Sequence, residues 1–351
     1  MKRKFKVQRS KFKVKAVFAF ILWSLIFGLV SYSQDIHFSQ FNFSPLNQNP
    51  ANTNLFDGDY RFVGNYRNQW PSVPVRYNTF SASAEMNCLT LKNNDRIGAG
   101  LVLFFDRAGD SRFTSVNTAV SVSYIKALDK KLHHALSIGI QLGLVNRNIN
   151  YSKLNFDNQW NGDVFDPNIA VDESFLKTRF NSFDLGIGFA YRWTKAERTN
   201  FTLGFGVTHL TQQKQTFYND NSVKLNPRFT VHIRGQVKVA KQWDIVPELM
   251  FQMQDTKYEV GYGAHAKYYL AIQAAHTVAV NFGAYGRSAE AGWLLGGMDY
   301  DNLQVNLSYD INFSKLHVAS RYNGGFEVSV IYILAKVKNI NKPGAICPAF
   351  L

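Results

Sequence analysis

Residues 136–144 read Leu-Ser-Ile-Gly-Ile-Gln-Leu-Gly-Leu, with an aliphatic side chain at every second position. Successive side chains of a β-strand point to opposite faces, so this alternation is typical of a strand with one apolar and one polar face. The same pattern recurs at residues 183–191, 201–207, 229–239 and 303–311. Because no later stretch keeps a convincing helical period, the sequence predicts an all-β protein.

The alternating segments indicate about fourteen antiparallel strands. We expect them near residues 60–68, 77–86, 95–105, 112–126, 133–147, 179–193, 199–212, 226–239, 242–255, 257–271, 274–286, 289–299, 302–313 and 325–338. Most have ten or more residues, whereas globular strands have about five or six and a tilted transmembrane strand needs about nine to eleven. Long strands, an even count and one continuous apolar face favour a single transmembrane barrel of the outer-membrane type. The alternative is a large secreted sandwich or jelly roll.

Composition excludes several classes of protein. The mean hydropathy of −0.19 argues against a polytopic helical membrane protein, and 29 Phe, 17 Tyr and 6 Trp argue against a disordered chain. The net charge is +14, but eight of the basic residues lie in residues 1–15, so the rest of the chain carries only +6. A nucleic-acid-binding function therefore has little support.

The first 33 residues are expected to be a signal peptide. A basic stretch precedes the apolar run 16–30, and Ser31 and Ser33 then form a small-x-small cleavage pattern. An uncleaved anchor helix is the alternative. We expect residues 34–59 to form an N-terminal periplasmic or plug segment and residues 60–338 the transmembrane barrel, with 339–351 a periplasmic C-terminal tail.

The lengths of the connections predict how the barrel is oriented. The long connections, 148–178, 213–225 and 314–324, all follow odd-numbered strands. Outer-membrane barrels have short periplasmic turns and longer external loops. We therefore expect an outer-membrane protein whose N- and C-termini are both periplasmic.

The chain has two cysteines, Cys88 and Cys347. Cys88 follows the second strand and Cys347 lies in the tail after the last, so both belong on the periplasmic rim. A Cys88–Cys347 disulfide in that oxidising compartment is a hypothesis. Two unpaired thiols, or pairing with another protein, are the alternatives.

Several motifs resemble the PorP/SprF family of outer-membrane proteins associated with bacterial type IX secretion, over essentially the whole chain after residue 33. They read QD at 34–35, FSQF at 38–41, PLNQNPA at 45–51, NYRNQW at 65–70, FDP at 165–167, YNGGFE at 322–327 and CPAF at 347–350. The chain departs from the family at Ala349, where a basic residue is expected, and by ending in an additional Leu351.

The resemblance implies a non-enzymatic barrel that helps to export a type IX substrate, or retains it at the surface, including adhesins of gliding motility. The implied partners are outer-membrane lipid, the C-terminal domain of a secreted adhesin-like protein, and a periplasmic lipoprotein that binds peptidoglycan. The competing hypothesis is an outer-membrane channel for a small or hydrophobic solute. We expect no nucleic-acid partner.

Residues near the N-terminus are the candidate site. We expect partner or plug contacts from Phe38, Gln40, Asn49, Pro50, Asn65, Arg67, Asn68, Gln69 and Trp70. Residues 34–59 lack strand alternation, so we expect them to enter the lumen as a plug or to lie beneath the barrel as a docking segment; a disordered segment is the remaining alternative. Charged residues at polar, inward positions are expected to form a network or to line a pore: Asp184, Glu248, Glu290, Glu327, Arg192, Arg234, Lys238 and Lys267.

The sequence offers no candidate catalytic, cofactor-binding or metal-binding residues. Its eight histidines are scattered, with no carboxylate or thiol cluster at metal-ligand spacing. No nucleophile elbow, phosphate-binding loop or paired-cysteine zinc motif is present. We therefore expect a protein without enzymatic activity.

Overall fold

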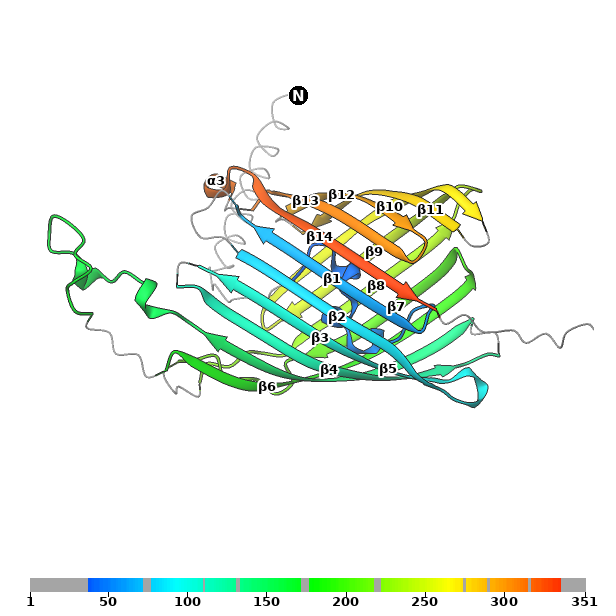
Figure 1. Ribbon diagram of the computed structural model, residues 1–351, viewed down its shortest axis with the longest axis horizontal. Helices are drawn as coiled ribbons and strands as arrows, with labels where there is room; N and C mark the ends of the chain where they lie inside the picture. Colours follow the sequence, from blue (N-terminus) through cyan, green and yellow to red (C-terminus); the bar gives the residue numbers. More distant parts are fainter. Residues whose placement is uncertain are drawn as a thin grey trace, which may run out of the picture. The chain divides into compact units, whose positions relative to one another are not determined.

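Within the described residues, fourteen antiparallel strands close into one barrel, in which each strand pairs with its sequence neighbours and β1 pairs with β14 (Figure 1). The structure is a computed structural model, and it describes residues 37–71, 77–109, 111–130, 133–171, 177–217, 222–273, 276–288, 291–314 and 317–335. The barrel closes through ten residue pairs, from Tyr60–Leu334 to Gln69–Gly325. The predicted fold class is confirmed.

The elements are as follows. The strands are β1 (Tyr60–Gln69), β2 (Tyr77–Thr90), β3 (Arg96–Ala108), β4 (Phe113–Ala127), β5 (His134–Asn148), β6 (Arg179–Ala196), β7 (Thr199–Thr208), β8 (Arg228–Lys238), β9 (Trp243–Gln254), β10 (Lys257–Gln273), β11 (His276–Arg287), β12 (Ala291–Tyr300), β13 (Leu303–Asn312) and β14 (Asn323–Leu334). Short helices are η1 (Phe41–Phe43), α2 (Pro45–Gln48), η2 (Pro50–Asn52), η3 (Lys92–Asn94), η4 (Tyr151–Lys153), η5 (Asp157–Gln159) and α3 (His317–Ser320). None of the helices described is long and apolar enough to cross a membrane.

Side-chain alternation decides which face of each strand points outward. In β5, Ile138 and Leu142 are 58% and 63% exposed on the outside, whereas Ser137 is fully buried on the inside. Large apolar side chains are exposed in this way on every strand, which gives the barrel an apolar exterior suited to lipid.

The two ends of the barrel differ. We call the end at which β1 begins and β14 ends the termini end, and the opposite end the loop end. The long connections 149–178, 209–227 and 313–322 all lie at the loop end, because each follows an odd-numbered strand. At the termini end, turns such as 197–198 and 239–242 are short.

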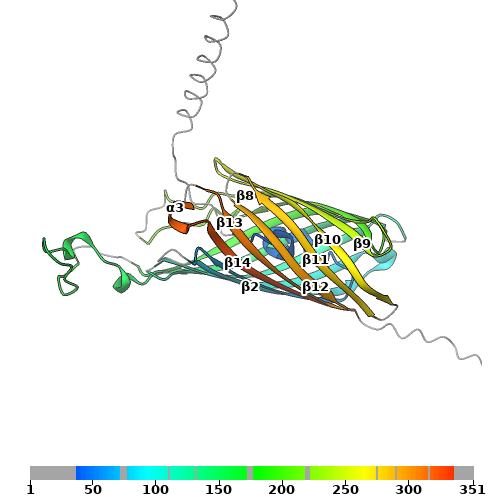
Figure 2. The same cartoon turned by 90° about the horizontal axis from the view of Figure 1, so that it is seen from above.

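The interior of the barrel is occupied by the chain's own N-terminal part. Residues 37–59, which we call the luminal segment, comprise η1, α2 and η2 and lie inside the ring of strands, drawn in blue in Figures 1 and 2. Nearly all of this segment is buried up to Phe56. The core of the protein is therefore the contact between the luminal segment and the inward faces of the strands.

Candidate functional site: the luminal segment and the barrel wall

The luminal segment is irregular, and side chains of the wall bond many of the backbone groups that its own short helices leave without a partner. Asn65 Nδ2 of β1 donates to Phe43 O at 3.0 Å, and Ser137 Oγ of β5 donates to Ala51 O at 2.7 Å. The remaining wall-to-carbonyl contacts are Ser123 to Thr53, Arg61 to Asn52, Arg96 to Phe56, Arg192 to Leu55, Arg228 to Asn47 and Arg67 to His37. The inner wall thus recognises polypeptide backbone.

Glu327 of β14 clamps the start of this segment. Its two carboxylate oxygens accept the backbone N–H groups of Ser39 at 2.8 Å and of Gln40 at 2.9 Å. The side-chain amide of Gln40 donates to Ser308 Oγ at 3.0 Å and accepts from Ser329 Oγ at 2.7 Å. A buried carboxylate is stable only when it is well hydrogen-bonded, so the clamp fixes the position of both partners.

Ion pairs surround this clamp. Arg67 of β1 lies 3.0 Å from Asp310 and 3.8 Å from Glu327, and all three side chains are buried. Arg287 of β11 lies 2.9 Å from Glu259 of β10. Removing one member of such a buried group leaves an uncompensated charge, which costs more than the intact pair contributes.

A second clamp holds the other end of the segment. Arg61 pairs with Glu85 through two contacts, Nε–Oε1 at 2.7 Å and Nη2–Oε2 at 2.8 Å. Glu85 Oε2 also accepts the backbone N–H of Asn54 at 3.0 Å. The guanidinium of Arg61 stacks over the ring of Phe56, 4.5 Å from its centroid.

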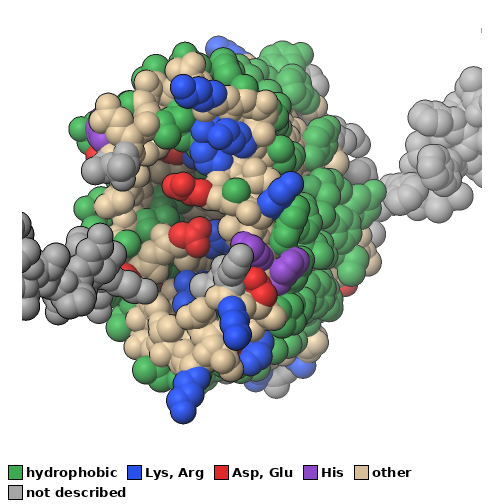
Figure 3. Space-filling view, turned by 90° about the vertical axis from the view of Figure 1, so that its right-hand side faces the viewer, with side chains coloured by type: hydrophobic (Ala, Val, Ile, Leu, Met, Phe, Trp, Pro, Cys, Tyr) green, Lys and Arg blue, Asp and Glu red, His purple; other side chains and the backbone are tan. Residues whose placement is uncertain are grey.

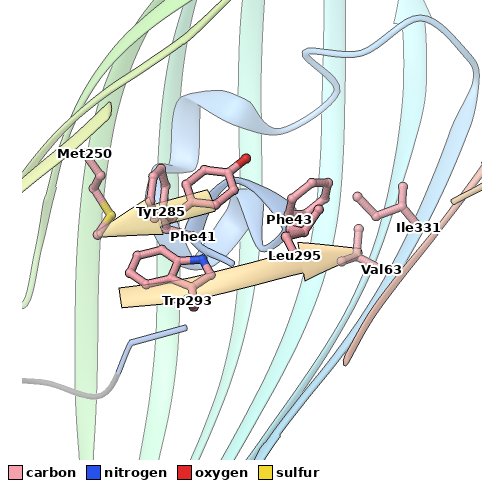
Figure 4. Close-up of a cluster of buried hydrophobic side chains, with 8 residues drawn as sticks. All are labelled: Phe41, Phe43, Val63, Met250, Tyr285, Trp293, Leu295 and Ile331. Carbon is pink, nitrogen blue, oxygen red and sulfur yellow. The ribbon is translucent and has the colours of Figure 1, made fainter. Parts of the chain in front are cut away.

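Apolar contacts complete the attachment (Figure 4). Phe41 and Phe43 project from η1 into a buried cluster, in which Tyr285 and Trp293 stack with their ring centroids 5.5 Å apart. The other members of this cluster are Val63, Met250, Leu295 and Ile331. Smaller clusters form around Ala51 and Leu55 and around Leu46. Burial of these side chains, at about 25 cal/mol per Å² of apolar area, stabilises the segment inside the barrel.

Two inward glycines make room for η2. A Cβ on Gly139 of β5 would overlap the backbone of Pro50 and Ala51, and a Cβ on Gly188 of β6 would overlap the Asn49 side chain. Glycine in a strand often marks a site where another backbone approaches closely. These glycines therefore let the luminal segment lie directly on the wall.

Asn49 is the central polar contact of the segment. Its Oδ1 accepts Ala51 N–H at 2.9 Å and caps η2, while its Nδ2 donates to Phe189 O of β6 at 3.1 Å. The same Nδ2 lies 3.2 Å from Nε2 of His232, a buried residue of β8. Because an amide N–H can only donate, His232 Nε2 is the acceptor and the ring is neutral.

The structure brings together six of the predicted site residues. Phe38, Gln40, Asn49 and Pro50 are buried in the luminal segment, and Asn65 and Arg67 contact it from β1. Phe38 packs edge-to-face on Phe104 with centroids 5.9 Å apart.

The other predicted site residues lie away from the segment. Asn68 donates to Asn78 at 2.6 Å, Gln69 is the last residue of β1, and Trp70 packs on Tyr77 at the loop end. Cys88 is exposed at the termini end of β2, and Cys347 lies outside the described residues, as does Glu290.

Sequence reasoning missed several residues of the site, chiefly Arg61, Glu85, Glu259, Arg287 and Asp310. Each is a charged residue at a buried, inward position of its strand. A charge in the inward face of a long alternating strand is the signal that would have identified them.

Aromatic residues meet at the loop end. Phe217 of the β7–β8 connection packs against Phe180 at 5.0 Å, Tyr151 at 6.2 Å and Phe113 at 6.3 Å between ring centroids. Phe113 and Phe180 come from β4 and β6, so this cluster joins two long connections to the mouth of the barrel.

Carboxylates hold the turns at the termini end. Hydrogen bonds from the side chains of Lys126 and Tyr124 keep the pKa of Asp95 below its ordinary value, and a hydrogen bond from the backbone N–H of Ala127 makes a smaller contribution. In the β12–β13 turn, the backbone N–H of Thr277 lowers the pKa of Asp301 in the same way.

A cavity of about 280 Å³ lies between the luminal segment and the termini end. Figure 3 views this end and shows it hollowed, with acidic, basic and histidine side chains around the opening. The luminal segment forms one side of the cavity through residues that include Phe43, Gln48 and Asn52, and the wall contributes β1, β6, β7, β8, β13 and β14. Among the described residues, no cluster of three or more histidine, cysteine or acidic side chains is arranged to hold a metal ion.

Comparisons with known proteins identify the family. Residues 30–332 match the family described as type IX secretion system membrane protein PorP/SprF. A search of curated proteins found no match.

Similar solved structures include two toluene transporters and a FadL homologue. The toluene transporter TbuX of Ralstonia pickettii is 11% identical over 85% of this chain and 94% of that one, with a TM-score of 0.48. The toluene transporter TodX of Pseudomonas putida is 9% identical over 82% and 92%, with a TM-score of 0.47. A FadL homologue of Pseudomonas aeruginosa is 9% identical over 81% and 92%, with a TM-score of 0.46. Because the family match extends from residue 30 through nearly all of the last strand, the chain belongs to the PorP/SprF family of type IX secretion system membrane proteins and is an outer-membrane barrel.

Proposed function

We propose that the protein is a non-enzymatic partner of the type IX secretion or gliding machinery, which exports a secreted adhesin-like protein or anchors it at the cell surface. Its immediate partners would be the C-terminal domain of that substrate and, at the periplasmic side, a lipoprotein that binds peptidoglycan. The termini end would face the periplasm, with residues 1–33 removed as a signal peptide.

The observation that carries this proposal is the occupied lumen. The Glu327 clamp holds Ser39 and Gln40 and the Glu85 clamp holds Asn54, and wall side chains of β1, β4, β5 and β8 contact the backbone of the segment between them. Arg96 of β3 and Arg192 of β6 contact it just beyond Asn54, at Phe56 and Leu55. A pore for a freely diffusing solute needs an open path, whereas a filled barrel offers its two ends as binding surfaces. The filled lumen therefore favours a docking role over a channel.

The loop end carries a surface suited to such docking. In the β5–β6 connection Trp160 and Val164 are 57% and 58% exposed, and Phe165 pairs with Trp160 in an isolated bridge. Exposed apolar side chains grouped on a connection are typical of a protein-binding site. We assign the secreted substrate to this end.

The test is surface display in a strain that lacks the protein. We expect one type IX substrate to disappear from the surface, measured by surface proteolysis and mass spectrometry, while other substrates of the system remain. Complementation with the double variant Trp160→Ser, Phe165→Ser should fail to restore it, whereas Ser152→Ala in the same connection should restore it fully. Unchanged display together with altered uptake of a small hydrophobic solute would instead identify a channel.

A further inference from the structure

We propose that the cavity at the termini end binds a short, uncharged, irregular segment of a second polypeptide, which continues the contact surface already used by the luminal segment. The segment would belong to a protein that reaches this end of the barrel from the periplasm. The proposal rests on the proposed function, because that function supplies a partner at this end.

The wall of the cavity carries polar side chains that the luminal segment does not use. Asn200 and Thr202 of β7 and Gln304 of β13 point inward and make no side-chain hydrogen bond with other described residues. In the barrel register Asn200 lies opposite Gln236 and Thr202 opposite Arg234, so β7 and β8 present a polar track that leads inward to His232. Amide and hydroxyl groups both donate and accept, as a peptide backbone requires.

The arginines that line the cavity are already paired with acids, and Glu197 is an exposed side chain at its rim. Arg61 pairs with Glu85, Arg192 with Asp57 at 2.5 Å, and Arg234 with Glu248 at 3.1 Å. An anion or cation would have to compete with these pairs, whereas a neutral segment need not disturb them. This balance favours an uncharged ligand over a phosphate, a carboxylate or a metal ion.

The luminal segment provides the precedent for a peptide ligand. Its carbonyl groups are held by an amide and by hydroxyl groups of the wall, the groups that Asn200, Gln304 and Thr202 present in the cavity, and also by arginine. The cavity also has an apolar side, formed by Phe43, Ile331 and Ile333, which can receive an aliphatic side chain. Its volume of about 280 Å³ is just below the roughly 300–1,000 Å³ typical of ligand pockets, so the bound segment must be short.

Site-specific photo-crosslinking in living cells tests the proposal. A photoreactive phenylalanine analogue is placed at Thr202 or Gln304, which face the cavity, and at the adjacent Leu203 or Leu303, which face lipid and are 39% and 37% exposed. We expect both luminal positions, and neither lipid-facing one, to form an adduct with the same protein, and peptide mapping to place the crosslink in one short segment. A synthetic peptide of that segment should bind the purified full-length protein.

A cavity-filling variant provides the second measurement. Thr202→Trp should weaken binding of the mapped peptide by about tenfold or more, whereas Leu203→Trp should leave it unchanged. Heat-modifiable migration in detergent gels shows whether each variant retains a folded barrel.

If the partner still co-purifies but luminal positions give no adduct, the cavity assignment is wrong and the proposed function stands. If adducts contain only non-peptide material, the ligand class is wrong; if display is also unaffected in the deletion strain, the proposed function fails.

Discussion

Glu327 lies at one of the most constrained positions of the molecule. It is 1% exposed, accepts two backbone N–H groups of the luminal segment and faces both Arg67 and Asp310. Arg67 pairs with both acids, the Ser39 hydroxyl donates to Asp310, and the two backbone N–H groups of the luminal segment donate to Glu327. The position of the luminal segment therefore depends on this one side chain.

Glu327→Gln should loosen this attachment. The amide keeps one acceptor and loses the other, so a buried backbone N–H is left unsatisfied and Arg67 loses part of its compensation; we expect a loss of about 1–3 kcal/mol in the free energy of unfolding. Guanidinium unfolding in detergent, followed by tryptophan fluorescence, measures it. Glu197→Gln, an exposed change at the termini end, should stay within about 0.5 kcal/mol of the parent. Equal changes in the free energy of unfolding for the two variants would contradict the role of Glu327 in holding the luminal segment.

Gly139→Ala tests the close approach of η2 to the wall. The new methyl group would overlap the backbone of Pro50 and Ala51, which cannot move aside as a flexible side chain could. We expect destabilisation of about 1–3 kcal/mol, measured by the same unfolding experiment. The matched control is Gly64→Ala in β1, where the methyl group would meet nothing within 4 Å. A neutral result at both glycines would show that the segment does not rest on β5.

Among the elements, the luminal segment decides whether the barrel is open. Barrels of eight strands are filled by their own side chains and those of sixteen to eighteen strands leave an aqueous channel, so a fourteen-stranded barrel has interior space that something must fill. Here η1, α2 and η2 fill it with polar contacts, apolar clusters and no strand pairing. An element attached in this way can be removed without breaking the sheet.

Deletion of residues 37–56 should therefore convert the protein into an open pore. In planar lipid bilayers we expect the parent to show little conductance and the deletion variant a stable, high conductance. The double variant Thr53→Cys, Ser121→Cys is the control, because the two hydroxyl oxygens lie 2.6 Å apart and a disulfide there would fix the segment to β4. This variant should remain closed under oxidising conditions. High conductance of the locked form would mean that ions bypass the segment.

The β2–β3 turn should respond to acid. Because Lys126 and Tyr124 hold the pKa of Asp95 below its value of about 3.9 in an unfolded chain, Asp95 stabilises the folded protein fully above that pH. This stabilisation is lost as the pH falls through the lower, folded-state pKa. The difference in unfolding midpoint between the parent and Asp95→Asn should thus be largest at pH 6 and shrink at pH 3. A constant difference would exclude the ionised form as its cause.

The strands could be predicted from the sequence because the alternation of apolar and polar residues that indicates a strand lies within the strand itself. The segment predicted at 133–147 is β5, His134–Asn148. The strand predicted at 199–212 ends earlier, at Thr208, because His209 adopts a left-handed backbone with φ of 61°.

The sequence alone does not decide whether the luminal segment lies inside the barrel or beneath it. Its position depends on contacts between residues far apart in the chain, such as Gln40 and Glu327, which are 287 residues apart. Glycines in the inward face of a strand, such as Gly139 and Gly188, are the local sequence feature that indicates close approach of another backbone to the wall.

At the scale of the whole molecule, the asymmetry between the two ends predicts the orientation in the membrane. Every long connection lies at the loop end, and barrels of this kind place long loops outside the cell. Cys88 is exposed at the termini end and provides a native probe. We therefore expect a membrane-impermeant maleimide, added after treatment with a reductant that opens any disulfide, to leave Cys88 unlabelled in intact cells and to label it once the outer membrane is permeabilised.

The complementary probe is a cysteine at Asn161, in the long β5–β6 connection of the loop end. In a Cys88→Ser background, Asn161→Cys should react in intact cells, because the connection faces the medium. The relation between the two positions is the decisive result: a barrel inserted the other way would label Cys88 and protect residue 161. That outcome would move the cavity to the cell surface, and its polypeptide ligand would then have to be extracellular.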